Sequence, residues 1–223
     1  MKFLIKFPTR SRREKFFYTL DKYISLFSPE NDFRVLVSCD YDDVEMNNLS
    51  TIDKLKSYEQ VCFFFDKRTN KIDAINRDID KVDYQWDILI SAADDMIPVK
   101  LGYDKVIVEE MNKNFSNLDG ALWFYDGFRK DINTQSIMGK NYYNQFGYIY
   151  HPSYLTWFCD DEYTEVGKRN EKLIFVDKCI IRHEYHNTCA GVSFDKLYQE
   201  NERPELKLKD QENYRNRQQL GFP

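Results

Sequence analysis

The first half of the chain alternates between short apolar runs and segments whose apolar residues recur every three or four positions. Short runs are typical of buried strands, and the longer period is typical of helices that bury one face. The pattern predicts strands at residues 3–7, 33–37, 61–65 and 86–90, and helices at residues 12–27, 50–57 and 72–82. Strands that alternate with helices predict an α/β fold with a parallel sheet and crossover helices.

The alternation is weaker after residue 98. The pattern there predicts helices at residues 103–111 and 161–168, and strands at residues 121–125, 146–150 and 173–181. The segment from residue 194 to residue 223 is highly charged and has few apolar residues. We expect it to form a peripheral helix or to be partly disordered.

Composition places the chain among globular proteins. Its 223 residues are 42% hydrophobic and 31% charged, which predicts a folded domain with its own core and excludes a disordered chain. No apolar run approaches the roughly 18 residues of a membrane-spanning helix, so no transmembrane segment is expected. The apolar run at the N-terminus is broken by Lys6, and we interpret it as a first strand and not as a signal peptide.

Charge and cysteine content narrow the function further. The net charge of −5 disfavours a nucleic-acid binder that depends on a broad basic face. The five cysteines include no CxxC pair, which is typical of reduced, buried cysteines in a cytoplasmic protein. We therefore predict a cytoplasmic protein without disulfides.

In parallel α/β sheets, ligands bind beyond the carboxyl ends of the strands. The segments that follow the first four predicted strands are residues 8–10, 38–40, 66–68 and 91–95. Most of them carry charged side chains. This clustering is the first sign of a functional site.

Asp94 and Asp95 follow the fourth predicted strand directly. Two adjacent carboxylates after a buried strand are costly unless a cation compensates them, and oxygen ligands suit Mg²⁺ or Mn²⁺. A bound divalent cation could in turn hold a diphosphate. The alternative is that one aspartate caps the next helix and the other is solvated.

Two of the three histidines, His183 and His186, follow the last predicted strand. A neutral imidazole at a strand end can bind a metal. The alternative is a surface turn with incidental histidines.

Three acidic residues, Asp160, Asp161 and Glu162, lie at the start of a predicted helix. A carboxylate placed there could act as a general base, whereas acidic residues also stabilise the first turn of any helix. The basic run from Arg10 to Lys15 starts another predicted helix, where it could meet phosphate or simply be solvated.

Six motifs in this order resemble those of nucleotide-sugar glycosyltransferases of the GT-A type, close to the inverting family 2 group. They are IKFPTRSR, RVLVSCDYDD, KIDAINR, ILISAADDMIP, FCDDEYTEVGK and IIRHEYH. The resemblance covers residues 2–190 and implies one domain with a mostly parallel central sheet flanked by helices. It divides that domain into a Rossmann-like nucleotide-binding half (1–97) and an acceptor half (98–190), followed by a charged C-terminal extension (191–223).

The resemblance also implies roles for individual residues. The donor, a nucleoside diphosphate sugar and by preference a UDP-sugar, would contact Pro8, Thr9, Arg10, Asp40, Asp43, Lys71, Asn76, Arg77 and Asp94. Mn²⁺ or Mg²⁺ would be bound by Asp94, Asp95, His183 and His186. Ala92 stands where the fuller acidic motif has a carboxylate, which weakens the metal prediction. Asp160, Asp161 or Glu162 would be the catalytic base, with Asp160 preferred.

By this resemblance the chain transfers a sugar to a hydroxyl acceptor (a glycan, a protein or a nucleic acid) with inversion. Two other classes stay open: a module that binds a nucleotide sugar or glycan without turnover, and a nucleotidyl or phosphoryl transferase. The second class needs a glycine-rich phosphate loop, which the sequence lacks. A group of aromatic residues could form either an acceptor-binding wall or ordinary core. They are Trp123, Phe124, Tyr125, Phe128, Tyr142, Tyr143, Tyr148, Tyr150, Tyr154 and Trp157.

Overall fold

The computed structural model describes residues 1–223 and contains a central sheet of seven strands in the order β3-β2-β1-β4-β7-β6-β8. The strands are β1 (Lys2–Pro8), β2 (Asp32–Asp40), β3 (Val61–Asp66), β4 (Ile88–Ser91), β6 (Ala121–Phe124), β7 (Ile137–Gly139) and β8 (Leu173–Val176). Only β7 runs antiparallel to its neighbours. In the centre of the sheet, Ile5 lies opposite Val35 on one side and Ile90 on the other. The predicted α/β fold with a mostly parallel sheet is confirmed.

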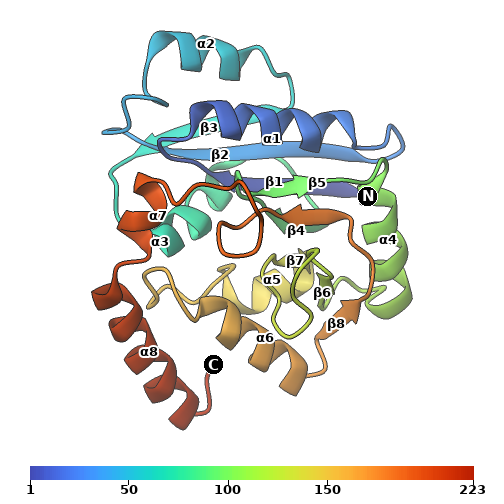
Figure 1. The fold of residues 1–223 in the computed structure, drawn as a ribbon. Coiled ribbons are helices and arrows are strands. Elements are labelled where there is room, and N and C mark those ends of the chain that lie inside the picture. Colours follow the sequence, from blue (N-terminus) through green and yellow to red (C-terminus); the bar gives the residue numbers. More distant parts are fainter.

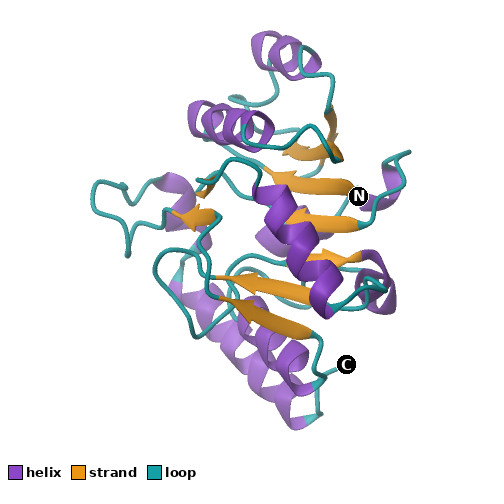
Figure 2. Ribbon diagram, turned by 90° about the vertical axis from the view of Figure 1, so that its right-hand side faces the viewer, coloured by secondary structure: helices purple, strands orange, loops and turns teal.

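Helices cover both faces of this sheet (Figures 1 and 2). They are α1 (Arg13–Ser25), α2 (Leu49–Lys56), α3 (Lys71–Asn76), α4 (Tyr103–Asn114), α5 (Lys140–Phe146), α6 (Cys159–Arg169), α7 (Lys196–Asn201) and α8 (Pro204–Gln219). Apolar residues of α1 and α4 pack on one face with alternate residues of β1, such as Phe3 and Ile5. Residues of α3, α5 and α6 pack on the other face with Leu4. Because both faces are covered, the central strands β1, β2 and β4 are mostly apolar.

The predicted helix at residues 72–82 is wrong in its second half. Helix α3 ends at Asn76, Arg77 is extended, and Asp78 has a positive φ of 72°. A short 3₁₀ turn, Ile79–Lys81, follows. The break turns Arg77 toward the carboxyl edge of the sheet, where its guanidinium contacts Asp40.

The second half of the chain departs further from the sequence-based prediction. The predicted strand at residues 146–150 is wrong, because α5 ends at Phe146 and the chain turns at Gly147 with φ 72°. The predicted strand at residues 173–181 is two strands, β8 and β9 (Ile181–His183), and β9 pairs with β5 (Met96–Pro98) in a separate two-stranded sheet. Strands β5 and β7 have three residues each, which is too short for a periodic signal.

Residues beyond 190 form α7 and α8, which pack against the rest of the fold. In Figure 1, α7 lies beside α3, and α8 runs down one side of the molecule. The buried carboxylate of Asp210 in α8 accepts hydrogen bonds from the backbone N–H groups of Leu155, Thr156 and Trp157 at 2.8–2.9 Å. Arg217 forms a bidentate ion pair with Glu162 of α6. No helix of the chain is both long and apolar enough to span a membrane.

Candidate active site

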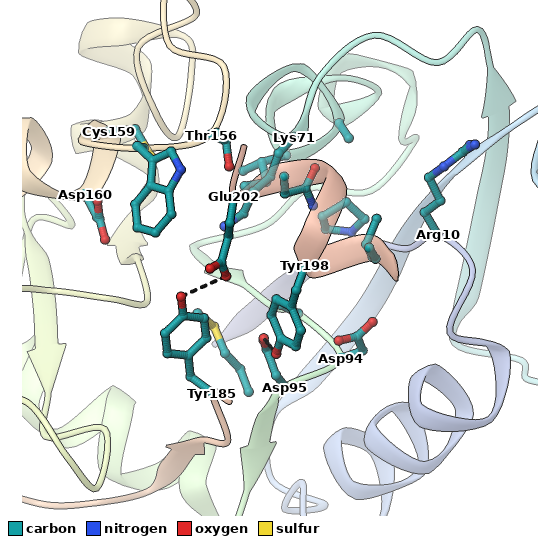
Figure 3. A pocket seen from close by; sticks show the side chains of 18 of the residues that line it. Arg10, Lys71, Asp94, Asp95, Thr156, Cys159, Asp160, Tyr185, Tyr198 and Glu202 are labelled. Carbon is teal, nitrogen blue, oxygen red and sulfur yellow. Dashed lines mark hydrogen bonds between the residues drawn. The ribbon is translucent and has the colours of Figure 1, made fainter. Parts of the chain in front are cut away.

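A cavity of about 590 Å³ lies at the carboxyl edge of the sheet. Its walls include the segments that follow β1, β2 and β4, as expected for a parallel sheet. The opposite wall comes from the start of α6, the loop before it and β9, and residues of α7 line the cavity as well. Figure 3 shows side chains from all these segments facing one space.

The cavity brings together many of the residues that the sequence singled out. Those that line it are Pro8, Thr9, Arg10, Asp40, Lys71, Asp94, Asp95, Asp160 and His183. The structure places the others outside it: Asp43, Asn76, Arg77, Asp161, Glu162 and His186. Of the aromatic group, only Phe128, Tyr150 and Trp157 line the cavity, and most of the remaining rings are core.

On the β1–β2 side, Asp40 is held between two arginines. Its two oxygens accept hydrogen bonds from Arg10 at 3.0 Å and from Arg77 at 2.8 Å, and Arg10 also pairs with Asp42. Thr9 lines the same wall, and its buried hydroxyl has no hydrogen-bond partner in the protein. A buried polar group without a partner is costly, so Thr9 is open to a bound ligand.

The neighbouring residues outside the cavity support this wall. Asp43 accepts a hydrogen bond from the backbone N–H of Ser11 at 2.8 Å and thereby fixes the loop after β1. Asn76 binds the backbone of Ile149 and Tyr150 through its side-chain amide. Asp43 and Asn76 therefore hold loops in place behind the cavity surface.

At the end of β4, Asp94 is buried beside two cations. Its Oδ1 lies 2.9 Å from Nη1 of Arg12 and 3.8 Å from Nζ of Lys15. Burial and the charge of Asp95 raise the pKa of Asp94 above its usual value, although Arg12 works in the opposite direction. Arg12 is also bound by Asp195, which precedes α7, and lies 4.0 Å from the ring centre of Tyr198.

Asp95 and Asp126 lie on either side of His183. The imidazole Nε2 is 3.8 Å from Asp95 and its Nδ1 is 3.9 Å from Asp126, which is ion-pair range and too long for a hydrogen bond. Burial opposes the charged imidazole, but the two carboxylates outweigh it and raise the pKa of His183 to about 9. The Tyr198 hydroxyl donates a hydrogen bond to Asp95 at 2.8 Å. His183 is therefore a cation in the cavity wall at neutral pH.

The divalent metal that the resemblance implies finds no ready ligand set among these side chains. No group of three or more His, Cys, Asp or Glu residues lies close enough together to hold an ion. Asp94 is paired with Arg12, Asp95 with Tyr198 and His183, and His186 with Glu202. In this arrangement the residues do not fit a metal.

Asp160 stands apart from the other acidic residues that line the cavity. It projects from the first turn of α6, and its carboxylate accepts only one hydrogen bond, a 3.2 Å contact from the backbone N–H of Asp161. Burial and the charge of Asp160 raise the pKa of Asp161 to about 6. Glu162 is buried, bound by Arg217 and the Tyr154 hydroxyl. Of the three acidic residues at this helix start, only Asp160 faces the cavity.

Sequence reasoning did not place Asp126 or Tyr198 in the site. Asp126 follows β6, which runs parallel to β4, so its position just beyond a strand end was a usable signal. Tyr198 lies on a short polar helix, and no pattern near it marks a site. Its role depends on how the last 30 residues pack.

The solved structures with a similar fold include both glycosyltransferases and a synthase. A mannosyltransferase from Pyrobaculum calidifontis, in complex with GDP-Man and Mn²⁺, is 12% identical with a TM-score of 0.63, over 82% of this chain and 56% of that one. S. aureus TarS (residues 1–349), in complex with UDP-GlcNAc, is 14% identical with a TM-score of 0.63, over 89% of this chain and 64% of that one. A 4-diphosphocytidyl-2C-methyl-D-erythritol synthase from Anaerococcus prevotii is 13% identical with a TM-score of 0.51, over 88% and 93%.

These likenesses establish the architecture. The chain has the GT-A-type fold of nucleotide-sugar glycosyltransferases, as the sequence motifs predicted. It spans between half and two thirds of the length of the two glycosyltransferase chains. No protein-family model and no curated protein matches it by sequence.

Proposed function

We propose that the chain is a glycosyltransferase that moves a sugar from a nucleoside diphosphate sugar to a hydroxyl acceptor. The observation that carries the proposal is the isolation of Asp160. The other carboxylates that line the cavity are engaged by arginine, histidine, tyrosine or threonine side chains. A general base must be free to accept a proton, and Asp160 is the carboxylate that is free.

The donor would lie across the strand ends. Thr9, Arg10 and Asp40 form the wall beside which the nucleoside would bind, with Lys71 at the start of α3. The diphosphate would reach the cations Arg12 and His183. Both a GDP-sugar and a UDP-sugar complex are known among the similar folds, and a UDP-sugar is the first donor to test.

The proposed reaction uses a base on one wall of the cavity and cations on the other. The acceptor hydroxyl attacks the anomeric carbon as its proton passes to Asp160, and the bond from that carbon to the diphosphate oxygen breaks. The electron pair leaves with the diphosphate, where the fixed positive charges of Arg12 and His183 stabilise it. Because base and leaving group lie on opposite sides of the sugar, the anomeric configuration inverts. No step is assigned to a metal ion.

The first experiment incubates the purified protein with a panel of nucleotide sugars in Mn²⁺, Mg²⁺ or EDTA. Release of nucleoside diphosphate and thermal stabilisation are measured together. We expect one donor to stabilise the protein and to be turned over, with activity retained in EDTA. Stabilisation without release under all conditions, with any acceptor, would indicate a binding module. Release of pyrophosphate from a nucleoside triphosphate would indicate a nucleotidyltransferase.

The second experiment tests the base. Asp160→Asn removes the proton acceptor and keeps the shape, so we expect turnover to fall by about 10²- to 10⁴-fold while donor binding is unchanged. Asp161→Asn is the matched control, because Asp161 is adjacent but lies outside the cavity. Full activity of Asp160→Asn would refute the assignment, and an equal loss in both variants would point to a damaged helix.

A further inference from the structure

The arginines and lysines that line the cavity fall into two groups. Four arginines form ion pairs with carboxylates of the chain: Arg10, Arg12, Arg68 and Arg129. Arg203 has no carboxylate partner and donates only to the backbone oxygen of Glu200, at 3.1 Å. Lys71 is also unpaired and lies on the donor side. Arg203 therefore carries an uncompensated positive charge at the cavity.

A second unpaired cation lies on the same helix end. Arg203 immediately precedes α8, and Lys207 follows one turn later. The Lys207 ammonium lies 4.8 Å from the centre of the Trp157 ring and forms no ion pair. Trp157 lines the cavity, and its indole N–H is buried without a hydrogen-bond partner. An aromatic ring, a hydrogen-bond donor without a partner and two cations without ion pairs thus lie together.

Helix α8 fixes this group in place. Asp210 accepts hydrogen bonds from the backbone N–H groups of Leu155, Thr156 and Trp157, so the loop that carries the indole is bound to the helix that carries Arg203 and Lys207. Three residues after Trp157, Asp160 lies in the first turn of α6 and also lines the cavity. Trp157, Arg203 and Asp160 therefore line one wall of the cavity, and Lys207 lies just outside it, over the Trp157 ring.

We propose that this wall binds an acceptor that is an anionic saccharide, bearing phosphate or carboxylate groups. The inference rests on the proposed function and names its acceptor class. A sugar ring stacks its C–H face on Trp157 and accepts a hydrogen bond from the indole N–H. Its anionic group pairs with Arg203 and Lys207, and a hydroxyl faces Asp160. Among the hydrogen bonds that Arg203 and Lys207 can form, charge-assisted ones to phosphate or carboxylate are the strongest.

A nucleic acid offers the same two features, a stacking ring and an anion, but needs more positive charge along its backbone. The neighbouring acidic residues Asp131, Asp160, Asp161 and Glu165 and the net charge of −5 oppose an extended phosphate chain. A saccharide with a localised charge fits two cations better.

The test titrates the full chain with four probes at fixed ionic strength, by calorimetry. The probes are a neutral tetrasaccharide such as cellotetraose, tetragalacturonate, a tetrasaccharide with a terminal phosphate, and octauridylate RNA. We expect at least one anionic saccharide to bind about tenfold or more tightly than the neutral one, and the two anionic arms identify the group that is recognised. Equal affinity for neutral and anionic saccharides, or tighter binding of RNA, would overturn the proposal.

Four variants locate the effect. Arg203→Ala combined with Lys207→Ala should remove the tenfold preference and leave the neutral probe unaffected. Lys209→Ala removes an exposed, unpaired lysine of the same helix that makes no cation–π contact with Trp157, and it should retain the preference. Trp157→Phe should keep saccharide binding and Trp157→Ala should lose it. A preference that survives in the double variant would contradict the assignment.

Donor binding is measured separately with the nucleoside diphosphate alone. If no nucleotide binds but the anionic saccharide does, the proposed function fails and the saccharide site stands. If the nucleotide binds and the saccharides show no charge preference, the transferase stands and the acceptor class is wrong.

Discussion

Lys6 is a fully buried ammonium group in the interior strand β1. Its Nζ donates a hydrogen bond to the Ser38 hydroxyl, which donates to Asp78. Burial lowers the pKa of Lys6 to about 7, although the charge of Asp78 opposes the shift. In the unfolded chain the same amine keeps its proton until about pH 10.4. Between these values the unfolded state binds more protons, so the free energy of unfolding rises with pH.

We therefore expect the wild-type protein to gain up to about 3 kcal/mol of stability from Lys6 between pH 7 and pH 9.5, at roughly 1.4 kcal/mol per pH unit. Lys6→Met should lack this contribution. Urea unfolding of both proteins at several pH values measures the difference. Stability curves that stay parallel from pH 7 to pH 9.5 would show that Lys6 keeps its proton in the folded state.

At the level of elements, β7 depends on one close backbone approach. A Cβ atom at Gly139 would lie 2.3 Å from the carbonyl oxygen of Leu118, which is backbone and cannot move aside freely. The backbone N–H of Gly139 also donates to the carbonyl of Gly120 at 2.9 Å. The strand that joins β4 to β6 is therefore compatible only with glycine at its end.

Gly139→Ala should destabilise the protein by about 1–3 kcal/mol, the usual cost of overpacking. Gly147→Asn is the control, because Gly147 has φ 72° with open space around it and asparagine tolerates that conformation. Thermal and urea unfolding compare the two. An unchanged midpoint for Gly139→Ala would mean that the loop at Leu118 shifts easily.

How far the sequence predicts these elements depends on whether local patterns decide them. Strands β1 to β4 contain apolar runs, buried in β1, β2 and β4 and half-buried in β3, and the prediction found them all. Strands β5 and β7 are fixed by pairing with distant residues, such as Met138 opposite Leu89 and Ala121, and no local pattern predicts that. The same division holds in the site: strand-end residues such as Asp40 and Asp94 were predictable, whereas Tyr198 reaches Asp95 only through tertiary packing.

At the level of the whole molecule, the last 30 residues connect the two walls of the cavity. Asp195 binds Arg12 behind β1, and Glu200 binds Arg68 after β3. Helix α8 binds the opposite wall through Asp210 and Arg217. The segment from residue 191 to residue 223 therefore contacts both halves of the proposed transferase domain.

Ending the chain at residue 203 removes Asp210 and Arg217 and leaves Glu162 buried without its cation, a loss that typically costs about 3–5 kcal/mol. We expect a lower melting temperature and loss of sugar transfer. Thermal unfolding and nucleoside diphosphate release measure these effects, with the charge-preserving variant Arg217→Lys as a milder control. A truncated protein with wild-type stability and activity would show that α8 is only an appendage.

The contact between Arg12 and Asp195 joins residues 183 positions apart, and this separation has a consequence for synthesis. As the chain leaves the ribosome, strands β1 to β4 can pair long before α7 emerges. Until then Arg12 and Asp95 lack Asp195 and Tyr198, and the loop at Trp157 lacks Asp210. The proposed catalytic cavity therefore acquires its final form only after Asp195, Tyr198 and Asp210 have emerged, so a chain terminated before them can carry a folded sheet without carrying the finished site.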